Sequence, residues 1–445
     1  MQMGDPAGAF TALSTKKPGC GCGGPQVETR RDAFPEPGSA AREVPGVPGC
    51  GAGDGRSSSK TDGDAMAKRK TSVVGKNGKS RGGNGQAGGK LEGLAKSVAE
   101  MAFRKKDPEM LIPARMLSNV AFNEKTRHVE MGDAKQSRSF FNYGQAKRFM
   151  QTLLVASKCK ELIDRGKTAS IRQIYYLSKH TIKGTKEKTF DDQAESDPII
   201  EDVEVAIDAL REELHVFASN RGNLAGPITL VDAGNTLDCT AMGSAGYAVP
   251  SIVEADVMQF KKCTAKFILH VEKDTVWRRF HEDRFWEMHN CIVSHGGGQP
   301  ARGMRRLLQR MHEELKLPVY VLLDNDPWGY YIYSVIKHGS INLAYESRRM
   351  AIPDAVFLGV SSFDYERCDM SDDVKIELDA ADIKRAKQIA NYTWFANKRP
   401  WQKEIKKMLQ NGFKMEVEAM ISKDLSYLTE EYVPMKLKDK KQWLD

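Results

Sequence analysis

The chain has 445 residues, of which 40% are hydrophobic and 8% aromatic, which is enough for two or three domains with buried cores. It has no apolar run long enough to cross a bilayer and no compact apolar stretch typical of a secretory signal, so we expect a cytoplasmic protein without a membrane span. The net charge is +8, and basic residues gather at 68–90 and 436–441, a pattern found in tails that bind nucleic acid and in tails that only aid solubility.

Residues 1–90 are poor in large apolar side chains and rich in Gly, Pro, Ser and charge, so we predict a disordered tail. The stretch beginning at Met66 is similar to an ordinary protein start, which suggests the hypothesis that residues 1–65 do not belong to the native protein. Cys20, Cys22 and Cys50 lie here without a histidine among them, so a zinc site is a weak alternative. The other five cysteines are predicted to be buried free thiols.

Residues 91–250 are predicted to form one domain. Apolar spacing from Leu91 to Met101 and from about 145 to 162 predicts helices, with strands between them. Helical spacing continues through 198–216. Apolar runs on either side of a turn at 220–223 then predict a β-hairpin. Helices followed by a hairpin favour a winged-helix module.

A helix is predicted over residues 170–180, and its two sides differ in character. One side carries Ile171, Ile174, Tyr175 and Ser178, and the other carries Arg172, Tyr176, Lys179 and His180. A phenol with a pKa of about 10 is a poor nucleophile, but neighbouring cations favour the phenolate and attract a phosphodiester. Arg172 can also donate hydrogen bonds to a charged transition state. The plain alternative is a surface tyrosine on a basic helix.

Residues 251–445 alternate between strand-like and helical patterns, which predicts an α/β domain with a mainly parallel sheet. The strand-like runs are 265–271, 291–294, 318–323 and 354–360, and the clearest helical spacing covers 302–316 and 330–337.

Three acids stand where two of these strands end. Glu272 follows the first strand, and Asp324 and Asp326 follow the third, pointing the same way because side chains alternate along a strand. Ligand sites in such sheets lie outside the carboxyl ends of strands, and oxygen ligands suit Mg²⁺. Aspartate is also common in turns, which is the alternative. The spacing of the three acids resembles the metal site of Toprim domains.

Several motifs, taken together, extend this resemblance. Arg-x-Ile-Tyr-Tyr at 172–176 precedes the acidic trio, and further similarity covers 112–120, 149–156 and 250–254. From about residue 108 to the C-terminus, the chain resembles the A-subunit family of type IIB DNA topoisomerases (topoisomerase VI), which includes the meiotic double-strand-break transesterases. The resemblance implies a winged-helix domain carrying the catalytic tyrosine, followed by a Toprim domain.

The resemblance also implies roles for single residues. The second tyrosine of the pair, Tyr176, becomes the nucleophile that attacks DNA, and Arg172 stands beside it. Glu272, Asp324 and Asp326 become Mg²⁺ ligands. Contacts with DNA are implied at Lys179, His180 and Arg305.

The resemblance also implies partner proteins for this chain. The family works as A-subunit homodimers in which each protomer cuts one strand of a duplex and leaves a 5′-phosphotyrosyl link. This chain has no phosphate-binding loop for ATP, so the resemblance implies a separate ATPase B subunit in an A₂B₂ assembly that acts at the nucleoid. Residues 394–401 and the basic tail 436–441 are candidate docking segments for that ATPase.

Two departures from the family pattern affect the expected activity. Gln173 replaces an acid in the tyrosine motif, and Gly297 replaces the lysine of a Lys-Gly-x-Pro segment, although Gly298 and Pro300 match. Two alternatives to a topoisomerase therefore remain. One is a recombination-initiating transesterase that does not religate, and the other is a non-catalytic DNA-binding homologue.

Overall fold

The computed structural model describes residues 83–445, with side chains from residue 86 onward. Three predictions lie outside the described residues. They concern residues 1–65, the cysteines at 20, 22 and 50, and the basic residues at 68–82. Helix α1 (Gly83–Phe103) begins before the predicted tail boundary at residue 90. The boundary was wrong because Ala87 packs with Leu91 in the core, although the surrounding sequence is rich in glycine.

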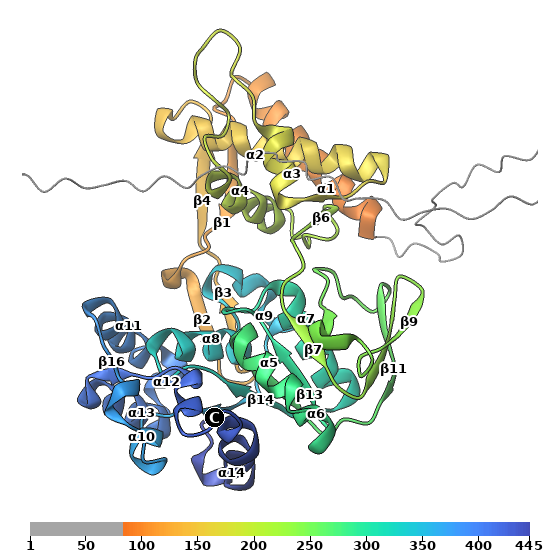
Figure 1. Cartoon of the computed structure of the whole chain (residues 1–445). Helices are drawn as coiled ribbons and strands as arrows, with labels where there is room; N and C mark the ends of the chain where they lie inside the picture. The colour runs from red at the N-terminus through yellow and green to blue at the C-terminus, as the bar shows by residue number, and fades with distance from the viewer. Residues whose placement is uncertain (1–82) are drawn as a thin grey trace, which may run out of the picture. The chain divides into compact units, whose positions relative to one another are not determined.

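The elements before residue 220 combine helices with short strand pairs (Figure 1). The predicted helices at 91–101 and 145–162 are confirmed as α1 and α2. The predicted helix at 198–216 is shorter and earlier, because α4 ends at Ala206. The bounds are β1 (Glu109–Pro113), β2 (Val120–Asn123), β3 (His128–Met131), β4 (Lys135–Ser139), α2 (Tyr143–Arg165), β5 (Ala169–Ser170), α3 (Ile171–Ser178), α4 (Gln193–Ala206) and β6 (Val216–Phe217).

A six-stranded sheet is the centre of the second half, in the order β10-β7-β13-β12-β14-β15. The four predicted strands are confirmed, and they run parallel to one another as β13, β12, β14 and β15. The bounds are β7 (Asn223–Ala225), β10 (Tyr247–Ala248), β12 (Ile268–Val271), β13 (Ile292–His295), β14 (Val319–Leu322) and β15 (Val356–Gly359). The chain is therefore a mixed α/β protein, as predicted.

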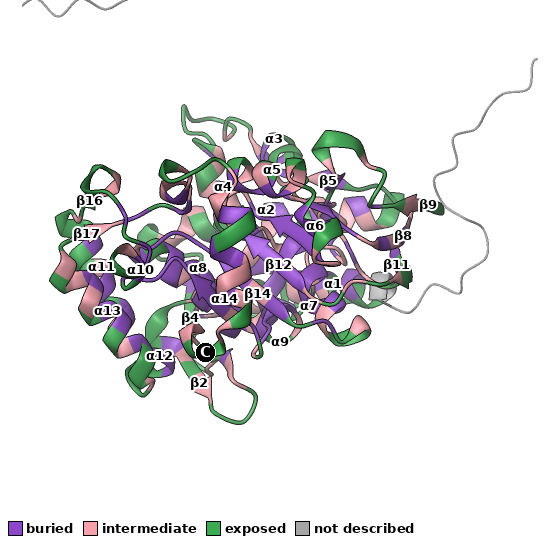
Figure 2. Cartoon of the chain, turned by 60° about the horizontal axis from the view of Figure 1, so that its bottom comes forward, coloured by how far each residue is buried: buried purple, intermediate pink, exposed green. Residues whose placement is uncertain are grey.

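Helices cover both faces of this sheet, so its strands are buried and purple in Figure 2. Alternation along β12 directs Ile268 into one core cluster and Leu269 and Val271 into the other. Helices α7 (Arg302–Leu315) and α8 (Pro327–His338) contribute to the first cluster. Helices α5 (Asp274–Glu282), α6 (Phe285–Met288) and α14 (Val433–Lys438) contribute to the second.

The remaining elements surround this core. A three-stranded antiparallel sheet has the order β11-β8-β9, and β16 pairs with β17. The bounds are β8 (Ile228–Asp232), β9 (Asn235–Asp238), β11 (Met258–Cys263), α9 (Ser347–Met350), α10 (Asp364–Arg367), β16 (Ile376–Glu377), α11 (Ala380–Ala390), α12 (Thr393–Ala396), α13 (Arg399–Asn411) and β17 (Phe413–Lys414). None of the helices within 83–445 is both long and apolar enough to span a bilayer.

The predicted hairpin around residues 220–223 is wrong. Its first arm, β6, pairs in parallel with β5. After the turn, β7 joins the large sheet antiparallel to β13, and β8 pairs with β9 and β11. The sheet therefore takes strands from before residue 250, where the domain division was predicted. A short antiparallel bridge between Thr181 and Lys188 forms directly after α3, at the position where a winged-helix module would have its wing.

The C-terminal segments are folded rather than free. Trp394 and Trp401 are buried in the core, and Lys436 is fully buried, with its Nζ 2.8 Å from Asp364 Oδ2. The chain end is anchored by paired backbone hydrogen bonds between Leu444 and Phe357. Trp394, Trp401 and Lys436 are therefore not available as docking residues, because they already pack within the chain.

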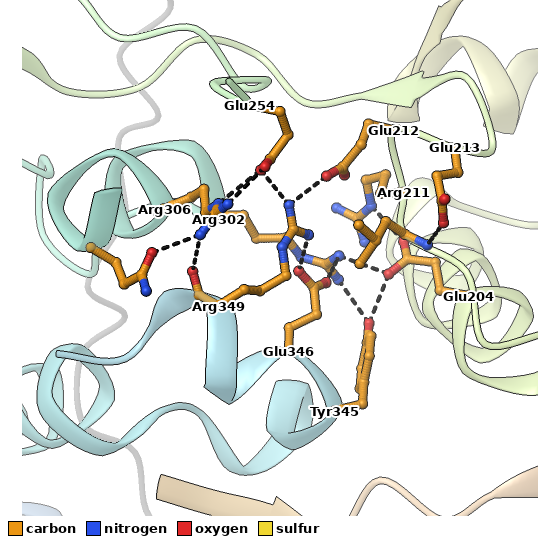
Figure 3. Close-up of polar contacts among 12 residues, drawn as sticks. Glu204, Arg211, Glu212, Glu213, Glu254, Arg302, Arg306, Tyr345, Glu346 and Arg349 are labelled. Carbon is orange, nitrogen blue, oxygen red and sulfur yellow. Dashed lines mark hydrogen bonds and ion pairs between the residues drawn. The ribbon is translucent and has the colours of Figure 1, made fainter. Parts of the chain in front are cut away.

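A buried network of arginines and glutamates joins α4 to the start of α7 (Figure 3). Glu204 is wholly buried and accepts hydrogen bonds from Arg302 Nη1 at 2.7 Å and Arg211 Nε at 2.6 Å. Burial alone would raise the pKa of Glu204, but the two arginines lower it, so the carboxylate stays charged. The network also includes Glu212, Glu254, Arg306, Tyr345, Glu346 and Arg349.

Replacing Glu204 with glutamine is expected to lower the free energy of unfolding by about 3 kcal/mol or more, because two largely covered arginines lose the countercharge of a wholly buried carboxylate. Urea unfolding of the full chain measures this. Glu287→Gln is the matched control. Glu287 pairs with Arg284 at the surface, where its side chain is 57% exposed, and the expected loss is below about 1 kcal/mol. Equal losses for the two variants would contradict a stabilising role for the network.

Candidate active site

The helix that carries Tyr176 begins with a capping box. Ser170 Oγ accepts from the Gln173 backbone N at 3.2 Å, and Gln173 Oε1 accepts from the Ser170 backbone N at 2.7 Å. A glutamine serves in this motif as well as a glutamate. The departure at Gln173 therefore leaves the start of α3 intact.

Helix α3 divides its tyrosines as the sequence predicts. Ile174, Tyr175 and Ser178 are buried, while Arg172 and Tyr176 face outward, with the Tyr176 side chain 59% exposed. The Arg172 guanidinium carbon lies 5.9 Å from the centre of the Tyr176 ring. Within the described residues nothing is hydrogen-bonded to the Tyr176 hydroxyl, so this group is free to meet a substrate.

The two other cations predicted beside Tyr176 do not lie over its ring. Helix α3 ends at Ser178, so Lys179 and His180 do not continue its outer face. Lys179 Nζ donates to the hydroxyl of Tyr175 at 2.5 Å. His180 is exposed, and its backbone N donates to Thr189. Arg172 thus lies over the Tyr176 ring, while Lys179 contacts Tyr175 and is close enough to Tyr176 for the pKa of its ammonium group to be raised by that side chain as well.

The acidic trio lies at the carboxyl ends of adjacent parallel strands. Glu272 follows β12, and its Oε2 accepts from the backbone N of Asp324 at 3.2 Å. Asp324 and Asp326 follow β14. Asp326 caps α8 by accepting from the backbone N of Gly329, so the turn between strand and helix holds it in place. No hydrogen bond or ion pair in the described chain links this trio to Tyr176.

Crowding of these acids changes their protonation. Burial, followed by the nearby charges of Asp324 and Asp326, raises the pKa of Glu272 to about 7. Burial raises the pKa of Asp326 to about 6, with Asp324 adding to the effect. Buried carboxylates that repel one another are relieved by a bound cation, and an all-oxygen donor set suits Mg²⁺.

Lys273 places a positive charge beside these acids, a role that the sequence did not predict. Its Nζ lies 3.0 Å from Asp324 Oδ2, 3.1 Å from Glu416 Oε1 and 3.2 Å from Glu418 Oε2. Within residues 86–445, no three acidic, histidine or cysteine side chains already converge as a metal-binding group. Asp324 is engaged by Lys273 and by the backbone N of Val417, and Asp326 is engaged by its helix cap. A divalent ion that binds Asp324 would share this carboxylate with the ammonium group or compete with it.

The raised pKa of Glu272 predicts a pH-dependent response to metal. A carboxyl whose folded pKa is raised contributes most to stability below its ordinary pKa of 4.5, and this contribution is lost as pH rises to about 7. In EDTA, the melting temperature of the wild type relative to Glu272→Gln should therefore fall across this window. Mg²⁺ should restore stability more at the upper end, because protons no longer compete. A magnesium effect independent of pH would contradict this.

A glycine-rich loop passes beside the trio. The backbone N of Gly298 donates to the Glu272 carbonyl at 2.9 Å, and Gly297 and Gly298 both have positive φ. Arg221 Nη2 donates to the Gly297 carbonyl at 2.6 Å. An arginine from a distant segment therefore brings a positive charge to the loop position where the family pattern has a lysine.

Arg305 requires a correction. It was predicted to contact DNA, but its side chain is only 3% exposed on the inner face of α7. Burial lowers the pKa of Arg305 to about 10, with the charge of Arg302 as a smaller cause. The prediction failed because a motif match does not reveal which side of the helix faces the core.

Comparison with known proteins identifies the family. Three family models match consecutive parts of the chain: type IIB DNA topoisomerase at residues 147–216, the all-beta domain of the DNA topoisomerase VI alpha chain at 220–264, and the Toprim domain shared by topoisomerase 6 A subunits and Spo11 at 267–437. The A subunit of type 2 DNA topoisomerase 6 from Pyrococcus horikoshii is 40% identical over 362 residues, which cover 79% of this chain and 94% of that protein. The chain belongs to the topoisomerase VI A-subunit family.

Similarity within the topoisomerase VI A-subunit family extends to plants. The type 2 DNA topoisomerase 6 A subunit of Hyperthermus butylicus is 40% identical over 358 residues, covering 77% of this chain and 92% of that protein. The A3 subunit of DNA topoisomerase 6 from Oryza sativa subsp. indica is 34% identical over 333 residues, covering 75% and 73%. The predicted Toprim domain and the predicted enzyme class, a DNA topoisomerase and hence an isomerase, are confirmed.

Proposed function

We propose that this chain is the subunit that cleaves and reseals duplex DNA in a type IIB topoisomerase, with Tyr176 as nucleophile. The exposed Tyr176 beside Arg172 is the observation that supports this most directly, because no other group within the described residues occupies its hydroxyl. The Tyr176 hydroxyl gives up its proton, its oxygen attacks phosphorus, and the bond from phosphorus to the 3′-oxygen breaks. The 3′-oxygen takes up a proton, and the new phosphotyrosyl bond preserves the energy needed for resealing.

Glu272, Asp324 and Asp326 would hold Mg²⁺, which stabilises negative charge on the reacting phosphate when bound. This chain's own groups orient the reactants. The cap of α8 fixes Asp326, and Arg221, held on the Gly297 carbonyl, offers a positive charge beside Glu272. Arg172 would donate hydrogen bonds to the phosphate at Tyr176.

Cleavage of both strands requires two copies of this chain. No described contact joins Tyr176 to the acidic trio of the same chain, which fits a homodimer in which the tyrosine of one copy works with the acids of the other. Strand passage further requires an ATPase B subunit, in an A₂B₂ assembly. Chromosomal DNA is the proposed substrate, which would place the protein at the nucleoid.

A plasmid assay tests this function. Supercoiled DNA is incubated with Mg²⁺ and the full chain, with and without ATP and a candidate ATPase partner, and trapped ends are digested with protease. We expect 5′ ends linked to a peptide containing Tyr176, and relaxation only with both partner and ATP. Covalent ends without relaxation would indicate a transesterase that only breaks DNA. Absence of covalent ends with every partner would reject the catalytic function.

A further inference from the structure

Trp328 is the only one of the six tryptophans that is largely exposed, with 49% of its surface open to solvent, and all six lie in the described part of the chain. Trp443 is half-buried against Tyr320 and donates its indole N–H to a backbone carbonyl. An indole that is half open to water keeps a large apolar surface available to a ligand, and its neighbours decide which ligand that surface suits. The other four are buried: Trp277, Trp286, Trp394 and Trp401.

Trp328 lies close in sequence to two residues of the acidic trio. It stands in the first turn of α8, two residues after Asp326. The next residue must be glycine, because a Cβ on Gly329 would lie 2.4 Å from the carbonyl oxygen of Asp324. This close packing fixes the start of α8 against the end of β14. Trp328 therefore keeps a constant place relative to the carboxylates.

A cation is held against the same indole. The guanidinium carbon of Arg385, on α11, lies 5.0 Å from the Trp328 ring centre and 4.1 Å from that of Tyr331. Arg385 donates to Gln388 at 2.7 Å, and no described carboxylate forms an ion pair with it. An arginine stacked on aromatic rings without a countercharge keeps its attraction for an anion.

Helix α11 carries further exposed cations beside Arg385, and its N-cap, Asp379, is an exposed acid. The cations are Lys384 and Lys387. The one acid within the helix, Asp382, is buried and paired with Lys414 at 2.7 Å. The exposed charge of this helix is therefore positive on balance, which favours a polyanion as the ligand.

We propose that Trp328 and Arg385 form a binding site for the DNA strand that passes the acidic trio. The indole packs against a deoxyribose, and the guanidinium binds the adjacent phosphate. This inference rests on the proposed function, since it takes duplex DNA as the ligand. Packing the half-exposed indole against the sugar removes apolar surface from water, so Trp328→Ala should weaken DNA binding by about tenfold.

Tryptophan fluorescence tests the contact without cleavage. The full chain carrying Tyr176→Phe is titrated with a short blunt duplex of mixed sequence in EDTA, and the same titration is made with Trp328→Phe added. The difference between the two emission spectra belongs to Trp328. We expect the duplex to quench this difference signal at saturation, and we expect Trp328→Ala to raise the Kd about tenfold. Trp443→Phe is the matched control and should leave both the quenching and the Kd unchanged.

Two results would overturn the proposal. In one, the duplex binds but the Trp328 signal and the Kd of Trp328→Ala do not change. In the other, the signal responds to protein concentration without DNA, which would assign Trp328 to a contact between protein chains. Covalent adducts of the wild type are measured separately. Quenching without adducts would therefore reject the catalytic function while supporting the DNA contact.

Discussion

Tyr176→Phe is expected to abolish covalent attachment of the protein to DNA, with a loss of at least about a thousandfold in cleavage, because no other group supplies the attacking oxygen. The side chain is 59% exposed and has no hydrogen bond within the described chain, so its removal should leave the fold unchanged. Denaturing gels of Mg²⁺ reactions with end-labelled duplex measure the adduct. DNA binding by the variant should stay within about twofold of the wild type, since a single hydroxyl is lost.

Tyr175→Phe is the matched control, because it removes the same hydroxyl from the neighbouring tyrosine. The Tyr175 hydroxyl accepts from Lys179 and donates to the Asp191 carbonyl at 3.2 Å. Its loss should cost about 1 kcal/mol of stability, the usual contribution of a hydrogen bond, and leave the adduct in place. Adducts that persist in Tyr176→Phe and disappear in Tyr175→Phe would transfer the nucleophile to Tyr175.

Glu272→Gln and Asp324→Asn are expected to reduce Mg²⁺-dependent cleavage by about a hundredfold or more, because a metal that stabilises a phosphoryl transition state contributes several kcal/mol. The same variants should lose the rise in melting temperature that Mg²⁺ produces in the wild type. Without metal, Glu272→Gln should melt above the wild type at pH 7, because burial and two neighbouring acids oppose the charge of Glu272.

Asp283→Asn serves as the control for these acids. Asp283 is a largely buried carboxylate in the same domain. It directly follows the last residue of α5 and pairs with Arg279 of that helix. This variant should lose stability and still respond to Mg²⁺. A magnesium response that survives in Glu272→Gln and Asp324→Asn would show that the metal binds elsewhere.

Several features of the site follow from short stretches of sequence. Glu272, Asp324 and Asp326 could be placed because apolar runs of strand length end directly on them, and parallel strands bring their carboxyl ends to one edge of a sheet. The partition of Tyr175 inward and Tyr176 outward follows from helical spacing alone. Gln173 could have been recognised as a helix cap from its place three residues after Ser170.

Other features depend on which segments pack together. Lys273 meets Glu416 and Glu418, more than a hundred residues away in sequence, only because β12 and the segment after β17 are brought together. The strand at 223–225 begins where a turn was predicted, and it pairs with β13 and β10, which no local sequence pattern identifies as its partners. Local patterns determine what a segment can form and which side is apolar. The identity of the partner, and so the burial of Arg305 and the exposure of Trp328, is decided by the packed core.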